Sequence, residues 1–204
     1  MQIVLDNNVE IGRLTRGMKK LHLLATMLST ALSACSFGDI IKLKSGVTGQ
    51  VDPDTCSICF FDKKLKTEDI KEVIEYCKEN SVTWLALENC GIDDDGATLI
   101  GKFLRENLTL EGLDLSDNCN ITDEGAKVLS CDLEKNKKLQ SLYLDNCSIG
   151  NRGVVLFWNA LLVNDALEKL SLKNNRGINR ESLKKHFNID PDNVLELLKI
   201  TLEI

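Results

Sequence analysis

The most reactive side chains of this chain are its eight cysteines, two of which form a C-x-x-C motif. Cys56 and Cys59 have the spacing of a thiol redox pair and of half a zinc site. A redox pair places its first cysteine at the start of a helix, and a zinc site needs a second pair of ligands. Here the motif leads into a predicted strand, and the sequence has neither a second C-x-x-C nor a histidine pair. We predict no metal site, and a cysteine-dependent enzyme with Cys59 as nucleophile is a distant alternative.

Histidine-based acid or base chemistry has little support, because the chain contains only His22 and His186. The sequence has no G-x-x-x-x-G-K-[ST] loop, no G-x-S-x-G elbow and no G-x-G-x-x-G fingerprint. Residues 93–95 are three aspartates, which are typical of a first helical turn because carboxylates favour the positive end of the helix dipole. We therefore predict no catalytic residue and no cofactor.

Composition limits the class of partner. The formal net charge is −6, which disfavours nucleic acid because binding to phosphates requires clustered lysine and arginine. A hydrophobic fraction of 43% in 204 residues is sufficient for a folded domain with a core.

Residues 18–35 have the three parts of a secretory signal. Met18-Lys19-Lys20 is basic, residues 21–31 are mainly apolar, and Leu32-Ser-Ala-Cys35 contains small residues. This ending resembles the lipobox of bacterial lipoproteins, and the resemblance implies cleavage before Cys35 and attachment of lipid such as palmitate to it. The apolar run is too short to span a bilayer as a helix.

Residues 1–17 depart from this pattern, since they precede the Met-Lys-Lys start. A misassigned start codon would explain them. The alternative is an amphipathic N-terminal helix, with Leu21, Leu24, Leu28 and Leu32 at near-helical spacing. Unpaired cysteines also favour a reducing compartment, which is evidence against export.

A nine-residue block recurs four times downstream, starting at residues 82, 110, 139 and 167, which are 28, 29 and 28 residues apart. Apolar residues occupy its first, fourth and sixth positions, and the last two of these have the period of a strand with one buried face. The fourth positions are Leu85, Leu113, Leu142 and Leu170. We expect these four leucines to stack as successive rungs of one interior.

Each block is followed by a segment with the spacing of an amphipathic helix. Apolar residues recur four and eight positions after a glycine at the start of each segment: Gly96, Gly125 and Gly153. Asn107, Asn136 and Asn164 each stand eleven residues after these glycines. We predict that these asparagines end the helices in the left-handed conformation.

The strand block has the pattern L-x-x-L-x-L-x-x-(N/C) of leucine-rich repeats. Four copies in strand-helix units of about 28 residues resemble the ribonuclease-inhibitor-like class of that family. The resemblance implies an α/β solenoid of right-handed units with a parallel sheet on its concave face. It covers residues 55–187, including a degenerate first unit. We expect a signal segment at 1–35, a tether at 36–54 with room for a short strand, and a C-terminal cap helix at 188–204.

The ninth position of the block is occupied by Cys90, Asn118, Cys147 and Asn175. In leucine-rich repeats this side chain points inward and holds the backbone of the strand-to-helix turn, so the resemblance implies a structural ladder. Cys90 and Cys147 are two repeats apart, roughly 9 to 10 Å at the usual strand spacing. This separation exceeds the roughly 7 Å between Cα atoms that a disulfide allows.

The positions between the inward-facing residues of each block are expected to face outward on the concave side. Exposed aromatic residues on a rigid surface often anchor protein interfaces. Three aromatic residues rimmed by three carboxylates form the candidate binding patch: Phe61, Trp84, Glu88, Asp114, Tyr143 and Asp145. The alternative is that Trp84 and Phe61 pack against the N-terminal segment.

These features predict a non-catalytic module that binds a protein partner on its concave face and is tethered to a bacterial membrane through Cys35. The alternatives are a secreted or cytosolic effector or scaffold of a bacterium living inside host cells, and a eukaryotic cytosolic regulator. Because repeat surfaces vary while the scaffold stays constant, a resemblance in fold does not identify the partner.

Overall fold

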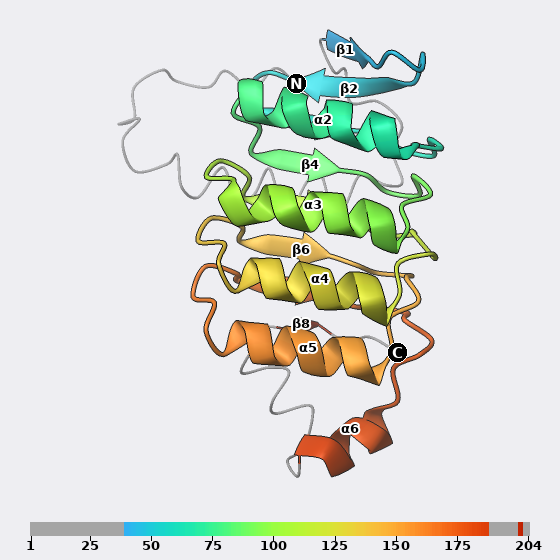
Figure 1. Ribbon diagram of the computed structural model, residues 1–204, viewed down its shortest axis with the longest axis vertical. Helices are drawn as coiled ribbons and strands as arrows, with labels where there is room; N and C mark the ends of the chain where they lie inside the picture. The colour runs from blue at the N-terminus through green and yellow to red at the C-terminus, as the bar shows by residue number, and fades with distance from the viewer. Residues whose placement is uncertain (1–38, 188–199, 202–204) are drawn as a thin grey trace, which may run out of the picture. The chain divides into compact units, whose positions relative to one another are not determined.

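The computed structural model describes residues 39–187 and 200–201 (Figure 1). The predicted signal segment, including Cys35, lies outside the described residues. Every helix within the described ranges is too short or too polar to cross a bilayer.

The described strands form one eight-stranded sheet in chain order. They are β1 (Asp39–Lys42), β2 (Thr48–Asp52), β3 (Ser57–Cys59), β4 (Trp84–Ala86), β5 (Gly112–Asp114), β6 (Ser141–Tyr143), β7 (Lys169–Ser171) and β8 (Ile200–Thr201). Pairing is antiparallel from β1 to β3 and parallel from β3 to β8.

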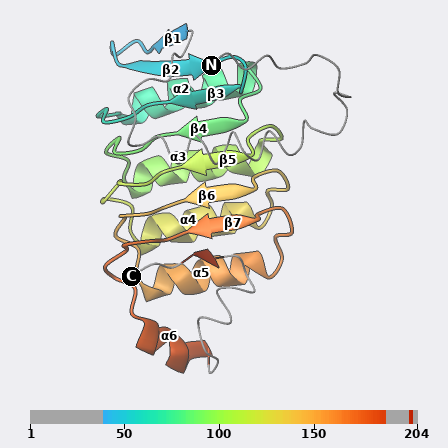
Figure 2. The same ribbon diagram turned by 180° about the vertical axis from the view of Figure 1, so that it is seen from behind.

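A helix follows each parallel strand from β3 to β7. The helices are α2 (Thr67–Glu79), α3 (Asp94–Glu106), α4 (Asp123–Leu133), α5 (Asn151–Leu161) and α6 (Arg180–Phe187). Helices α2 to α5 lie side by side in one layer, and the strands form the other layer (Figures 1 and 2). This arrangement confirms the predicted α/β solenoid with a parallel sheet.

The predicted register is confirmed by the strand pairing. Leu85 pairs with Leu113, Leu113 with Leu142, and Leu142 with Leu170. All four are at most 1% exposed and belong to one continuous core. The helix positions predicted to face this core are also buried, except Leu161, which is partly exposed.

The segment expected to be a tether is instead a β-hairpin. Strands β1 and β2 pair with each other, and β2 extends the sheet by pairing with β3. The hairpin contributes Leu43, 2% exposed, to the core, and the backbone of Gly49 lies against the ring of the buried Phe60. A Cβ at Gly49 would lie 2.6 Å from that ring. The sequence did not reveal the hairpin because its two strands are short and each carries few apolar residues.

The predicted cap helix at 188–204 is wrong where the structure describes it. Ile200–Thr201 form strand β8, and Ile200 pairs with Leu170 in the parallel sheet. The sequence here repeats the strand block, with apolar residues at its first, fourth and sixth positions: Leu197, Ile200 and Leu202. A short apolar run fits both strand and helix periods, so periodicity alone did not distinguish them. The rest of the segment lies outside the described residues.

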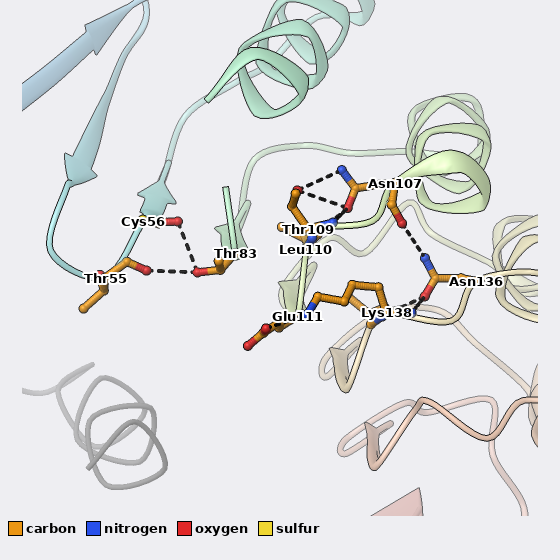
Figure 3. Close-up of polar contacts among 10 residues, drawn as sticks. Thr55, Cys56, Thr83, Asn107, Thr109, Leu110, Glu111, Asn136 and Lys138 are labelled. Carbon is orange, nitrogen blue, oxygen red and sulfur yellow. Dashed lines mark hydrogen bonds and ion pairs between the residues drawn. The ribbon is translucent and has the colours of Figure 1, made fainter. Parts of the chain in front are cut away.

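The prediction of left-handed asparagines at the helix ends is wrong. Asn107 follows α3 in an extended conformation, with φ −77° and ψ 133°. Asn136 and Asn164 are not among the described residues with positive φ either, and both are buried. Their side chains bond the previous repeat: Asn136 Nδ2 donates to the carbonyl of Leu104 at 2.6 Å, and Asn164 Nδ2 to that of Leu133. Figure 3 shows Asn107 and Asn136, where Asn136 Nδ2 also donates to the carbonyl of Asn107.

Five left-handed residues lie at the other turn, where each strand leads toward its helix; Cys56 before β3 and Ser81 after α2 are also left-handed, each with φ 51°. One residue per repeat has φ between 51° and 61° directly before or near the ninth position of the block: Asp62, Asn89, Asp117, Asn146 and Asn174. Asparagine and aspartate tolerate this conformation better than most residues. The chain therefore reverses at the same point in every unit.

Asn118 links the buried turns of two repeats. Its Oδ1 accepts hydrogen bonds from the backbone N–H groups of Cys90 at 3.0 Å and Ile92 at 2.9 Å. Its Nδ2 donates to the carbonyls of Leu87 and Leu115 at 2.8 and 2.9 Å. One amide thus satisfies four backbone groups that water does not reach, since Asn118 is 1% exposed.

The other three ninth-position residues occupy equivalent places. Asn175 Nδ2 donates to the carbonyl of Leu144 at 2.7 Å. Cys90 Sγ lies 3.1 Å from the carbonyl of Phe60, and Cys147 Sγ lies 3.6 Å from that of Leu115. The thiols therefore bond the preceding strand as the asparagines do, but leave fewer backbone N–H groups satisfied.

A third set of links lies where the helices begin. Asp94, in the first turn of α3, accepts hydrogen bonds from the backbone N–H groups of Thr122 at 2.8 Å and Gly125 at 2.9 Å. A Cβ at Gly125 would lie 2.5 Å from Asp94 Oδ1, so a residue without a side chain is needed there. Asp123 bonds the following repeat in the same way.

We predict that Asn118→Ala lowers the free energy of unfolding by about 3 kcal/mol, because it leaves several buried backbone groups without partners. Chemical denaturation of the full chain measures the change. The exposed Asn159 on α5 provides the matched control, and Asn159→Ala should change stability by less than about 0.5 kcal/mol. Equal effects of the two substitutions would contradict the ladder's role.

Candidate functional site

The candidate site lies on the face of the parallel sheet opposite the helices, which we call the strand face. Strand pairing aligns its side chains in rows across the repeats. One row is Trp84, Gly112, Ser141 and Lys169, and the next is Ala86, Asp114, Tyr143 and Ser171. This alignment follows from the stacking of the four leucines, because the residues that flank them pair in the same register.

Trp84 and Tyr143 come together across the intervening strand β5. Their ring centroids are 6.0 Å apart and the ring planes are inclined by 53°. The indole lies over Gly112, where a Cβ would stand 1.9 Å from a ring carbon. The missing side chain at Gly112 therefore provides the space in which Trp84 reaches toward Tyr143.

The aromatic residues differ in exposure. Trp84 is half-buried, Tyr143 is 6% exposed and Phe61 is 40% exposed. Phe61 follows β3 and lies beyond the row of Tyr143, level with Glu88 in the neighbouring repeat. The structure thus joins two of the three predicted aromatics in a ring contact. The alternative, in which Trp84 and Phe61 pack against the N-terminal segment, stays a prediction, because that segment lies outside the described residues.

Several positions expected to face solvent are buried. Tyr143, expected as an exposed aromatic of the patch, is 6% exposed, and Ala86 is 3%, Ser171 is 1% and Cys59 is 8% exposed. Neighbouring strands are only about 4.8 Å apart, so large side chains in adjacent rows cover small ones. Polar groups in these rows bond one another as well, since Ser171 Oγ lies 2.6 Å from Asp145 Oδ1.

Glu88 and Asp114 are half-buried carboxylates in neighbouring repeats. Burial raises the pKa of Glu88, and the negative charges of Asp114, Asp117 and Asp62 raise it further. Burial also raises the pKa of Asp114, as do Asp145 and Asp117, while hydrogen bonds from Ser116 act in the opposite direction. The strand face therefore carries a local excess of negative charge.

Asp145 is held by the next repeat. Its Oδ1 accepts hydrogen bonds from Ser171 Oγ at 2.6 Å and from the backbone N–H of Lys173 at 2.8 Å. Asp114 Oδ1 accepts from the backbone N–H of Ser116 at 2.9 Å. These bonds orient both carboxylates on the strand face.

Asp62 and Asp117 were missing from the predicted patch, although both add negative charge around Glu88. They occupy the left-handed position of the strand-to-helix turn, with φ 53° and 61°. The sequence signal was an aspartate or asparagine in the same place in every unit.

The cysteines offer little reactivity where they are buried. Burial raises the pKa of Cys77 and Cys147 to about 12 and that of Cys90 to about 11, so these thiols stay neutral. In the C-x-x-C motif, Cys56 is exposed in a turn whereas Cys59 is buried in β3. No cluster of potential metal ligands occurs among the described residues.

Comparison with known proteins identifies the repeats. The family model described as Leucine Rich repeat matches residues 106–130 and 135–157. No curated protein matches the chain. A solved structure of Leiomodin-1 Actin-Binding Site 2 (ABS2) is similar, with a TM-score of 0.51 and 27% identity. The likeness covers 56% of this chain and 66% of that chain, slightly less than two thirds of its length.

These matches and the strand-helix topology show a leucine-rich-repeat solenoid. Leucine-rich repeats typically form non-enzymatic scaffolds that bind proteins. The ladder at Cys90, Asn118, Cys147 and Asn175 holds this scaffold together, and the strand face presents side chains in a repeated register.

We predict that the double substitution Glu88→Gln and Asp114→Asn raises the free energy of unfolding at pH 7 by roughly 0.2 to 1 kcal/mol, as removal of like charges on adjacent strands does. A pKa that is higher in the folded chain means that folding disfavours the ionised form. These two groups therefore lower the free energy of unfolding as pH rises through the raised pKa. The gain in stability of the double variant should vanish near about pH 4, where the parent's carboxyl groups become protonated.

Thermal unfolding at several pH values measures this difference. Glu79→Gln with Glu106→Gln is the control, because it removes two exposed charges from α2 and α3 instead. A double variant at the strand face that is less stable than the parent at pH 7 would show that these carboxylates are stabilising there.

Proposed function

We propose that this leucine-rich-repeat chain is a protein-interaction module that binds a protein partner through its strand face. The observation that carries the proposal is the aromatic pair of Trp84 and Tyr143, whose ring centroids are 6.0 Å apart, with the Trp84 indole over Gly112. Aromatic side chains are enriched among the residues that dominate interface energies. A sheet held by three sets of inter-repeat bonds presents them in one geometry, which reduces the entropy lost on binding.

The predicted patch supports this proposal in its composition. Around the aromatic pair lie Glu88, Asp114 and Asp145, and Phe61 adds an exposed ring near Glu88. Aromatic residues with charged neighbours provide both contact area and selectivity. We also propose that the repeats are of the ribonuclease-inhibitor-like class, because each unit of 28 or 29 residues contains a helix.

A second part of the proposal places the module on a bacterial membrane as a lipoprotein. It rests on the sequence of residues 18–35, with its basic start, apolar stretch and Leu-Ser-Ala-Cys ending. Lipid on Cys35 would attach the chain to the membrane; stable attachment needs more than one acyl chain. A secreted or cytosolic scaffold without an anchor is the alternative.

Actin is a second candidate partner. The printed name of the similar leiomodin structure is an actin-binding site, and the identity of 27% extends over 56% of this chain. Cosedimentation of the purified chain with actin filaments tests this candidate directly. A pelleted fraction no larger than that of the chain alone would exclude filament binding.

We predict that Trp84→Ala weakens partner binding by about 30-fold, equivalent to a loss of about 2 kcal/mol. Gly112→Ala should weaken binding as well, because its methyl group displaces the indole without removing it. Crosslinking in native cells followed by affinity measurement with the captured protein provides the readout. Leu108→Ala is the control, since Leu108 is 77% exposed after α3. Unchanged affinity in the first two variants would exclude the aromatic pair as an anchor.

We predict that palmitate is incorporated into the parent chain in bacterial cells and is absent from Cys35→Ser. Globomycin should cause the unprocessed precursor to accumulate, because it blocks cleavage before the lipidated cysteine. Metabolic labelling and fractionation measure both effects. A full-length product that remains unlabelled in the supernatant would contradict membrane attachment while leaving the strand face untouched.

A further inference from the structure

The carboxylates of the strand face lack cationic partners within the part of the chain that the structure describes. The ion pairs found there involve other residues, such as Arg105 with Asp132 and Lys138 with Glu111. Glu88 and Asp114 form none of them. The bonds that Asp114 and Asp145 accept come from hydroxyl and backbone N–H groups, which carry no formal charge.

Four carboxylates gather in one region of the face. Asp62, Glu88, Asp114 and Asp117 follow or lie on the strands β3 to β5. Besides burial, Asp114, Asp117 and Asp62 raise the pKa of Glu88, and Asp117 raises that of Asp114, which is the mark of like charges held close together. A partner that brings positive charge to this region relieves the repulsion, and one that brings negative charge increases it.

The other end of the face has the opposite sign. Lys169 and Lys173 lie on or directly after β7, two strands from Asp114. Lys169 Nζ stands 4.7 Å from the centroid of the Tyr143 ring, a cation-π geometry. This contact shows that an ammonium group fits against the aromatic surface. Its neighbour Trp84 offers a second ring on the acidic side.

We propose that the strand face binds a segment of a protein partner that carries lysine or arginine side chains, with their cationic groups at Glu88 and Asp114 and an alkyl stem or guanidinium plane against Trp84. This inference rests on the proposed function and adds the chemistry of the partner. The sign change along the face also sets a direction: the basic end of the segment lies over β4 and β5, away from Lys169 and Lys173.

Selection from a random twelve-residue peptide library displayed on phage, with the full chain as bait, tests the partner's chemistry. The recovered peptides should be enriched in lysine and arginine relative to the library. Their affinity, measured by fluorescence anisotropy, should fall at least tenfold in the double variant Glu88→Gln and Asp114→Asn. It should also fall as salt rises, because charge pairing at an accessible surface is screened.

The control is Glu79→Gln with Glu106→Gln, which removes the same charge from exposed positions on α2 and α3 and should leave affinity unchanged. Binders without enrichment in basic residues, or binders equally affected by both double variants, overturn the inference. If such binders still lose affinity with Trp84→Ala, the strand face binds proteins and only the partner's basic chemistry is wrong. If Trp84→Ala has no effect either, the proposed function fails as well.

Discussion

The structure depends on the satisfaction of buried backbone groups by side chains of the neighbouring repeat. Every unit of a solenoid has turns whose N–H and carbonyl groups are shielded from water, and each unpaired group costs roughly 1 to 3 kcal/mol. Asn118 supplies four bonds at the strand-to-helix turn, Asn136 and Asn164 bond the helix ends, and Asp94 bonds the start of the next helix. A repeat therefore completes its neighbour, and the stack behaves as one unit.

This constraint explains why the strand face has one geometry. The stacked leucines place Trp84 and Gly112 side by side in one row, and Tyr143 on the third strand in the next row. The indole can then lie over the glycine, and the two rings meet on the strand face. The aromatic pair is a consequence of register, because a shift of one residue would turn these side chains toward the core.

The same rigidity holds unfavourable charges together. Glu88 and Asp114 stay close to other carboxylates because the backbone that carries them is bonded on both sides. Residues selected for stability alone would not be arranged in this way, since like charges on adjacent strands destabilise a sheet. The stability that these groups cost agrees with the proposal, carried by the aromatic pair, that the strand face binds a partner.

The sequence by itself determined the repeat, its register and the columns of the strand face, because a period of 28 or 29 residues with inward-facing leucines permits one way of stacking. It also placed the thiols of Cys90 and Cys147 inside the fold, and the structure shows them next to the carbonyls of Phe60 and Leu115. Only the tertiary structure decided the ends, since the hairpin before Cys56 and strand β8 are too short for their period to identify them. It also decided which outward positions are covered and how Trp84 uses the gap at Gly112, because exposure and ring contacts depend on side chains from different repeats that no local pattern relates.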